Sequence, residues 1–372
     1  MVISRRTVTL CATAASIIGL LACESAVSEV PSNGDADSDT DTDADTDADS
    51  DTDTDTDSDT DVDSDADGDG GVIVMDCSDC PAVGGTLDNM LCAFDLCDTD
   101  IVIQNEYVDV TPFDAILYSV EDSYQAVERF GSTTNDLAPM LNGSYALMAT
   151  GPAVGTVHSR ACSSTSVPDL WSDDPYMTWD VVEWRLTLTA PEEALGFRFK
   201  YVFFSEEYDD YISTEYNDKF YVFLEAASTS GGDTVLINFT SCRDPAIYYD
   251  FICEAGDPGC EEGEKYCYVA INSALSDCCW YDGCPDGYSM FVGTDIADTG
   301  FECAANPDDD MAQNGSSTGW LQTSWPVDGG ETFSLTFHHH DTSDEFYDSE
   351  VILDSFEFIK EADQGTIPIE IE

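Results

Sequence analysis

The chain has 372 residues, 42% of them hydrophobic and 11% aromatic, and its 77 acidic and 11 basic side chains give a formal net charge of -66 at pH 7. The sequence has no basic patch that could neutralise phosphates, so we expect neither nucleic acid nor anionic lipid headgroups as partners. Residues 71–372 alone carry 57 acids and nine bases. The folded part therefore needs screening by salt or by bound cations.

Residues 1–22 are typical of a cleaved export signal. The apolar run from Val8 to Leu21 follows two arginines and is too short for a stable membrane span. It ends in Leu-Leu-Ala-Cys23, which resembles the lipobox of bacterial lipoproteins. The resemblance implies that Cys23 is acylated and becomes the mature N-terminus, and that Glu24 directs the protein to the outer membrane. An ordinary secretory signal with a chance cysteine is the alternative.

Residues 35–70 form a low-complexity tract in which 18 Asp occupy every second position. Only Ser, Thr, Ala, Val and Gly separate them, so the tract has too little apolar surface to form a core. Like charges at this spacing extend the chain. We therefore expect residues 23–70 to be a disordered stalk that holds the folded part away from the membrane.

Residues 71–98 form a small neck that contains four of the chain's 15 cysteines. Cysteines at this density indicate an oxidising compartment. We therefore expect Cys77, Cys80, Cys92 and Cys97 to form two local disulfides, with a zinc knuckle as the alternative. Thirteen cysteines lie beyond the lipobox, so one thiol should remain for another chain or for a buried position.

Beyond the neck, short runs with period-two alternation recur, and no long segment keeps a helical period. The expected strands are Ile101–Val110, Ala115–Val120, Tyr145–Ala149, Val181–Thr189, Gly196–Phe204, Lys219–Glu225, Thr234–Phe239, Thr332–His339 and Glu350–Ile359. This spacing predicts an all-β domain over residues 99–360, a β-sandwich or jelly roll, with residues 361–372 as a tail.

Residues 242–303 hold eight cysteines and are predicted to form a disulfide-rich insertion in this domain. Adjacent cysteines rarely bond each other, so we expect Cys278 and Cys279 to have different partners. Trp280 and Tyr281 follow them and are candidate ligand-contacting residues, because exposed aromatic faces can bind sugars by stacking. The alternative is that these aromatic residues form the small core of a loop-rich segment.

An acidic corner interrupts the aromatic run of residues 203–224, FFSEEYDDYISTEYNDKFYVFL. Its Ser-Glu-Glu-Tyr sequence and the Asn-Asp pair that follows resemble the core motif of bacterial choice-of-anchor L domains. Residues 326–358 resemble the C-terminal pattern of that family, and residues 141–155 resemble an upstream strand. The resemblance covers residues 100–360 and implies an extracellular module on a tethered protein. The family pattern does not require the Cys-rich insertion.

The acidic corner supplies hard oxygen ligands, which are the donors that calcium prefers. If the corner and the acidic segment after residue 340 belong to neighbouring strands, one calcium ion could be bound between them. The five candidate ligands are Glu206, Asn217, Asp218, Asp344 and Asp348. The alternative is a turn of hydrogen-bonded Asx residues without a metal, with Glu207 and Asp354 capping backbone groups.

Three histidines follow one another at the end of the strand that contains Phe333, Leu335 and Phe337. Alternation along this strand places His339 inward and its two neighbours, residues 338 and 340, on the polar face. Two histidines at i and i+2 could bind zinc or copper. A polar strand surface is the favoured interpretation of His338 and His340.

The sequence contains no nucleophile elbow, Walker loop, Gly-rich dinucleotide turn or HExxH motif. Glu206 and Glu207 suggest a glycosidase, but sequence neighbours on a strand point to opposite faces. We predict a non-catalytic binding or adhesion module that is stabilised by calcium and anchored by lipid in the bacterial cell envelope. Its ligand would be an extracellular glycan or protein. The alternatives are a secreted hydrolase acting on polysaccharide and a purely structural envelope protein.

Overall fold

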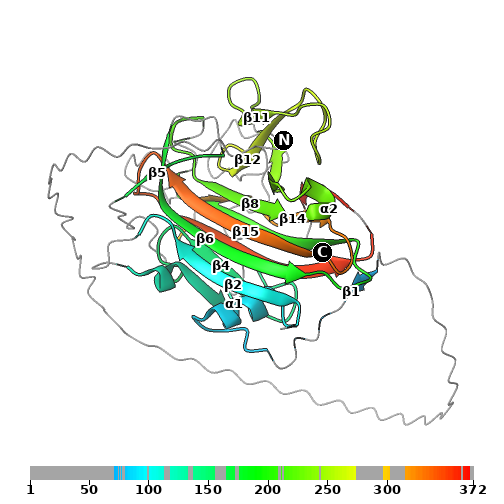
Figure 1. The fold of residues 1–372 in the computed structure, drawn as a ribbon. Helices are drawn as coiled ribbons and strands as arrows, with labels where there is room; N and C mark the ends of the chain where they lie inside the picture. The colour runs from blue at the N-terminus through cyan, green and yellow to red at the C-terminus, as the bar shows by residue number, and fades with distance from the viewer. Residues whose placement is uncertain are drawn as a thin grey trace, which may run out of the picture. The chain divides into compact units, whose positions relative to one another are not determined.

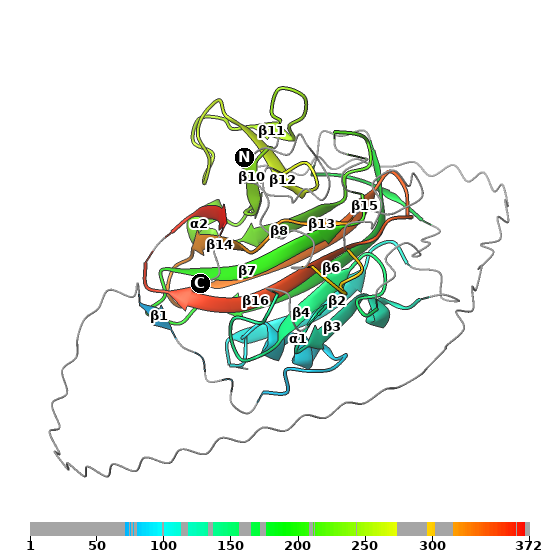
Figure 2. The same cartoon turned by 180° about the vertical axis from the view of Figure 1, so that it is seen from behind.

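Two antiparallel β-sheets make up most of the computed structural model (Figures 1 and 2). It describes residues 71–368, except 74, 76, 78, 79, 99, 113–117, 133–136, 156–164, 172–175, 208–210, 212, 243, 274–295, 302–314 and 362. The predictions for the export signal, Cys23, the stalk, Cys278, Cys279, Trp280 and Tyr281 lie outside the described residues.

The first sheet faces the viewer in Figure 2. Its spatial order is β17 (Gly365–Pro368), β14 (Leu321–Pro326), β7 (Gly196–Ser205), β16 (Ser349–Ile359), β4 (Tyr145–Ala149) and β3 (Tyr124–Val127), with β1 (Val72–Ile73) on β16 and β13 (Ser316–Ser317) on β7. All of these pairings are antiparallel. The end of the chain that was expected to be a tail therefore contributes a strand, β17.

The second sheet faces the viewer in Figure 1. Its spatial order is β10 (Phe239–Ser241), β12 (Lys265–Ala270), β8 (Lys219–Glu225), β15 (Thr332–Thr342), β6 (Met177–Thr189) and β2 (Val102–Asp109), with β11 (Phe251–Ile252) on β12, β5 (Val167–Pro168) on β6 and β9 (Thr234–Leu236) on β8. The two sheets pack together, which confirms the predicted all-β sandwich with little helix.

The helices that the structure describes are short. They are α1 (Leu87–Ala93), α2 (Ala227–Ser230) and one 3₁₀ helix (Val120–Ser123). None of them has the length and apolar character needed to cross a membrane. The strand expected over residues 115–120 is wrong at its end, because Val120 begins the 3₁₀ helix. Ser119 precedes this helix and forms a capping box with Asp122, in which each residue accepts a hydrogen bond from the other.

Alternation along the strands builds the main core between the sheets. Phe333, Leu335 and Phe337 of β15 point inward together with the aromatic side chains of β7. The ring of Phe197 stacks on that of Phe333 at 5.3 Å. A second apolar cluster covers the other face of the first sheet, including Val202, Phe204 and Ile352. The first sheet is thus buried on both faces, which explains why its strands read as nearly continuous apolar runs.

The neck packs into the sandwich. Cys77 is bonded to Cys97 and Cys80 to Cys92, so the disulfide prediction is confirmed and the zinc-knuckle alternative is wrong. Thr86 caps α1, and the residue after the helix, Phe94, is fully buried.

The Cys-rich segment is partly continuous with the second sheet. Cys242 is bonded to Cys267 and Cys253 to Cys260. β12 lies inside residues 242–303 and pairs with β8 through Val269 and Phe220. The first half of the predicted insertion therefore extends the sandwich.

Candidate metal centre at the acidic end of the sandwich

Three aspartates lie side by side on neighbouring strands of the second sheet. Asp218 directly precedes β8, Asp341 lies in β15 and Asp180 lies in β6. His340 pairs with Lys219, so the next pair in this register brings Asp341 opposite Asp218. All three aspartates are at most 1% exposed. Like charges in such cross-strand positions are destabilising unless something neutralises them.

A β-bulge sets the direction of Asp180. The pairing of β15 with β6 shifts register between His339 and Asp341, opposite Asp180. Asp180 has a φ of 45°, a left-handed conformation that an L-residue inside a strand rarely adopts. Bulges re-aim side chains and are common next to functional sites. The strain at Asp180 is therefore a reason to look for a function at this end of the sandwich.

The first sheet adds further carboxylates at the same end. Ser205 at the end of β7 pairs with Ser349 at the start of β16, which brings the next residues, Glu206 and Asp348, to this end. We call the following set the acidic end: Asp180, Glu206, Glu207, Asn217, Asp218, Asp341, Asp344, Asp348 and Glu350. Apart from half-buried Asp344, each is at most 6% exposed.

Hydrogen bonds fix the backbone around these side chains. The Glu207 Oε2 atom accepts a hydrogen bond from the Asp218 amide at 3.2 Å. The Asp218 Oδ1 atom accepts one from the Thr342 amide at 3.0 Å, and the Thr342 hydroxyl donates to the Asn217 carbonyl at 2.9 Å. Glu207 therefore caps a backbone group, which was one of the two roles considered for it. These bonds lock β15 to the corner that follows β7.

Several oxygens of the acidic end are buried and lack a hydrogen-bond partner. They are both carboxylate oxygens of Asp180, the Oδ1 atom of Asn217 and the Oδ2 atoms of Asp218 and Asp341. The Asn217 amide nitrogen is already used, because it donates to the Tyr248 hydroxyl at 3.3 Å. Buried polar atoms are almost always paired, so these oxygens make this end of the sandwich a candidate cation site.

Burial and mutual repulsion disfavour the ionised carboxylates. Burial, followed by the charge of Asp348, raises the pKa of Asp180 to about 9. The pKa of Asp341 is raised well above its usual value by burial and then by the charges of Asp218 and Asp180. Burial likewise holds the pKa of Glu350 well above the usual value. A divalent cation would reverse this balance, since it binds the charged form.

Two basic side chains in the described part of the chain lie close by in sequence and do not point at these carboxylates as cations. Lys219 follows Asp218 but points to the opposite face of the sheet, where its Nζ atom lies 3.6 Å from Asp169 Oδ2 and 3.8 Å from Asp250 Oδ1. His339 faces the core, and burial lowers its pKa to about 3, so its ring is neutral. Hard oxygen donors with this charge fit calcium better than softer metals.

Four of the five calcium ligands expected from the sequence, Glu206, Asn217, Asp218 and Asp348, are buried at this end of the sandwich, and their role as ligands stays a prediction. Asp344 lies at the edge, where its Oδ1 atom accepts a hydrogen bond from the Phe346 amide. Its charge nevertheless raises the pKa of Asp218.

Sequence reasoning missed Asp180, Asp341 and Glu350. Asp341 continues the inward alternation of β15, so the strand pattern held a signal for it. Asp180 lies just before the strand expected from Val181, at the bulge.

The carboxylates of the acidic end would have to turn toward one another to bind an ion. In the described part of the chain, one group of three His, Cys, Asp or Glu ligand atoms lies within 4.8 Å, and it consists of Cys253, Asp257 and Cys260. That group is a poor metal site, because its two sulfurs form a disulfide.

The histidine cluster agrees with the expectation only in part. His339 faces the core as predicted, with its Nε2 atom 2.8 Å from the Ser349 hydroxyl. The expected polar strand surface is wrong, because His338 is 8% exposed and His340 is fully buried. Their rings lie under Tyr221, and His338 Nε2 is 3.0 Å from His340 Nδ1. Glu183 bonds His338 Nδ1 at 2.8 Å, whereas the buried Nε2 atom of His340 has no hydrogen-bond partner and lies 3.9 Å from Asp169 Oδ2.

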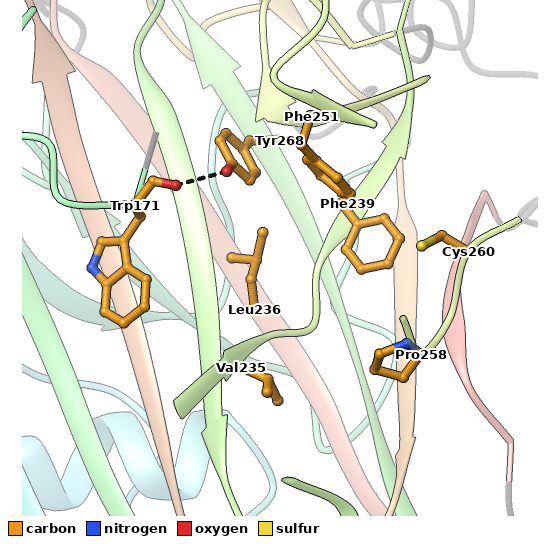
Figure 3. A pocket seen from close by; sticks show the side chains of 8 residues that line it. All are labelled: Trp171, Val235, Leu236, Phe239, Phe251, Pro258, Cys260 and Tyr268. Atoms are coloured by element: carbon orange, nitrogen blue, oxygen red, sulfur yellow. Dashed lines mark hydrogen bonds between the residues drawn. The ribbon is translucent and has the colours of Figure 1, made fainter. Parts of the chain in front are cut away.

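An aromatic pocket lies on the outer side of the second sheet (Figure 3). It encloses about 440 Å³, open solvent included. Its lining consists of Trp171, Val235, Leu236, Phe239, Phe251, Pro258, Cys260 and Tyr268. The Tyr268 hydroxyl donates to the Trp171 carbonyl at 2.8 Å. None of the lining residues is acidic, so this pocket does not provide the pair of carboxylates that glycoside hydrolysis requires.

Substitution of Gly151 should disturb the acidic end. A Cβ atom at Gly151 would lie 2.1 Å from Asp348 Oδ2, so Gly151→Ala must displace that carboxylate. We expect a loss of about 1–3 kcal/mol in the free energy of unfolding and a weaker response to calcium, both measured by urea titration. The matched control is Gly85→Ala, whose nearest neighbour is the end of the Gln125 side chain. Equal effects of both substitutions would contradict this role of Gly151.

Comparison with known proteins found no close relative of this chain. No family model and no curated protein matches the chain. Among solved structures, the K2 cleaved adhesin domain of Lys-gingipain is similar over 68% of this chain and 87% of its own, with 10% identity and a TM-score of 0.25. A similarity this low supports no conclusion about function, and the resemblance to choice-of-anchor L domains stays a prediction.

Proposed function

We propose that this protein is a non-catalytic binding module of the bacterial cell surface, anchored through a lipid on Cys23 and stabilised by calcium at the acidic end. The observation that carries the calcium site is the set of buried oxygens of Asp180, Asn217, Asp218 and Asp341 that lack hydrogen-bond partners. The candidate ligands are Glu206, Asn217, Asp218, Asp344 and Asp348. Bound there, calcium would tie the corner after β7 to β15 and β16.

The position of the acidic end supports a structural role for the ion. Asp180, Asp218 and Asp341 continue the inward-facing positions of β6, β8 and β15, so they lie between the two sheets, and each is at most 1% exposed. A buried site of this kind has no room for a substrate, whereas an ion there holds two sheets and their loops in one arrangement. The resemblance to choice-of-anchor L domains supports the surface location, and the 13 cysteines beyond the lipobox support an oxidising compartment.

The aromatic pocket is a described surface that could hold a ligand. Exposed apolar side chains occur close to its elements, with Leu170 at 78% exposure beside Trp171, and Ile252 at 45% beside Phe251. Aromatic faces of this kind bind sugar rings and apolar side chains. An extracellular glycan or protein is therefore the partner class that we propose.

Calorimetric unfolding of the full chain, with calcium or with chelator at fixed high ionic strength, tests the calcium site. A hundredfold excess of calcium over its Kd should stabilise the fold by roughly 2.7 kcal/mol. Asp218→Asn should remove most of this gain, and it should raise the midpoint in chelator because it removes one charge from the acidic end. Asp354→Asn is the matched control, since that buried carboxylate instead accepts a hydrogen bond from the Met140 amide at 2.7 Å.

If calcium stabilised the wild type and Asp218→Asn equally, the proposed calcium site would be contradicted. Calcium would then act through the Asp-rich tract and the general surface charge. The high ionic strength holds nonspecific screening constant in all samples.

A further inference from the structure

Two buried aspartates join the neck to the first sheet. Asp95 follows α1 and the buried ring of Phe94 in the neck, and Asp354 lies in β16. Asp95 is 3% exposed and Asp354 is fully buried. The backbone of Asp95 has a φ of 66°, a left-handed conformation that turns the chain away from the helix. This turn directs the Asp95 side chain to the backbone of β16.

A bulge in β16 presents its backbone to the neck. The pairing of β16 with β7 shifts register after Asp354, and Ser355 has a φ of 56°. The Ser355 amide donates a hydrogen bond to Asp95 Oδ2 at 3.0 Å, and the Phe356 amide donates to the Phe94 carbonyl at 3.1 Å. At the bulge, these two amides of β16 are therefore bonded to the neck and not to a neighbouring strand.

Every oxygen of the two carboxyl groups has a hydrogen-bond donor. Asp95 Oδ1 accepts from the Asn142 side-chain amide at 2.5 Å. Asp354 Oδ2 accepts from the Met140 amide at 2.7 Å, and its Oδ1 atom accepts from the Ser355 hydroxyl at 3.1 Å. These bonds hold the neck, the segment before β4 and the bulge of β16 together.

The other charged and titratable groups that face the pair do not neutralise it. They are Glu357 on β16, Arg198 and Lys200 on β7 and Tyr145 on β4. The Arg198 Nε atom is bonded to Glu357 at 2.7 Å. Lys200 lies opposite Asp354 in the register, but the ion pairs of the described residues include neither Asp95 nor Asp354. Burial raises the pKa of Tyr145, so its hydroxyl stays neutral.

Two neighbouring carboxyl groups in such a place titrate as a pair. Burial and the charge of Asp95 raise the pKa of Asp354 to about 7. Burial also raises the pKa of Asp95 to about 6, although the hydrogen bonds from Asn142, Ser355 and Asp354 lower it. Asp354 therefore keeps its proton longer than Asp95 and donates it to the Asp95 carboxylate.

We propose that Asp95 and Asp354 share one proton and form a pH-dependent latch, which holds the neck on β16 while the proton is present. Both folded pKa values lie above the unperturbed value near 3.9. The latch is thus fully stabilising below about pH 4, and its contribution is lost as the pH rises through about 6 to 7. The neck is then bound more tightly in acid than in alkaline solution. This inference does not depend on the proposed calcium site.

Amide hydrogen exchange of the full chain, in chelator at pH 5, 6, 7 and 8, would test the latch. The amides of Ser355 and Phe356 donate to the neck, so their exchange reports its opening. The amide of Phe337 in the middle of β15 reports unfolding of the core. After correction for intrinsic exchange, the protection of Ser355 and Phe356 should fall by about tenfold to a hundredfold between pH 5 and pH 8.

Protection of Ser355 and Phe356 that does not change with pH would overturn the latch. An equal fall at Phe337 would also overturn it, because the titrating groups would then act on the whole fold and not on the attachment of the neck.

Two variants assign the titration to the pair. Asp354→Asn keeps an oxygen for the Met140 amide and supplies an amide group that donates to Asp95 at every pH, so the protection of Ser355 should be equal at pH 5 and pH 8. The matched control is Asp180→Asn, which removes a titrating carboxyl group of the acidic end and should keep the fall seen in the wild type.

A wild-type fall in Asp354→Asn, or loss of the fall in Asp180→Asn, would overturn the assignment to the pair. Should Asp354→Asn fail to fold, the wild-type comparison of Ser355 with Phe337 and the result for Asp180→Asn still decide whether the neck has a pH-dependent latch of its own.

Discussion

Raising the pH from 7 to 9 in chelator should lower the free energy of unfolding of this protein by about 2 kcal/mol. The reason is the raised pKa of Asp180, about 9 in the folded state, against an unperturbed value near 3.9. The folded state then holds a proton that the unfolded state has already lost. Such a group stabilises the fold below its folded pKa, and that stability is lost as the pH rises through it. Asp218 and Asp341 shift in the same direction and add to the effect.

This pH window separates the acidic end from other groups. The pKa values of His339 and His340 are lowered by burial, so both rings stay neutral above pH 7. Asp354 has a pKa of about 7 and contributes only at the lower edge of the window. Urea titrations at pH 7, 8 and 9 would measure the slope.

Saturating calcium should flatten the slope, because the ion binds the deprotonated carboxylates and takes over the role of the protons. Asp180→Asn should flatten it in chelator as well, since the titrating group is gone. If neither calcium nor this variant changes the slope of stability against pH, the Asp180 carboxyl is not the titrating group and calcium does not bind to it.

Truncation of Phe94 should cost about 3–5 kcal/mol in the free energy of unfolding. Its ring is fully buried, with centroids 5.4 Å from those of Trp184, Phe337 and Phe356. Phe94→Ala therefore leaves a cavity where the neck meets both sheets. Urea denaturation followed by near-ultraviolet circular dichroism would measure the loss.

The matched control for Phe94 is Ile103→Ala on β2, because Ile103 is 63% exposed. We expect less than about 0.5 kcal/mol for that change. A small effect of Phe94→Ala would mean that the neck is a separate unit and contributes nothing to the core.

Strand alternation gave most of the sandwich correctly. β4 and β8 have the bounds expected from the sequence, and β7 and β16 differ by one residue. The same alternation also placed His339 inward. It failed for His338 and His340, because residues distant in the sequence cover the outer face of the second sheet. One of them is Tyr268, whose ring meets that of Tyr221 edge to face with the centroids 4.8 Å apart.

The acidic end was only half predictable for a similar reason. The acidic composition of the corner after β7 can be read from the sequence, and it made Glu206, Asn217 and Asp218 candidate ligands. Asp180 sits in an ordinary strand sequence, and neither the bulge nor the positive φ can be read from it. The adjacency of Asp218 and Asp341 depends on the pairing of β8 with β15, which joins residues more than 100 positions apart. Register at this distance follows from the whole fold.

The attachment of the neck also determines how the domain would respond to mechanical load. A pull arriving from residues before Gly71 would first reach β1, which is held to β16 by only two residue pairs, Val72 with Ile359 and Ile73 with Phe358. These pairs could part without breaking the core. The force would then pass to the disulfides of the neck and to the anchored ring of Phe94. Under load, the domain would thus lose the pairing of one short strand before the force reached its core.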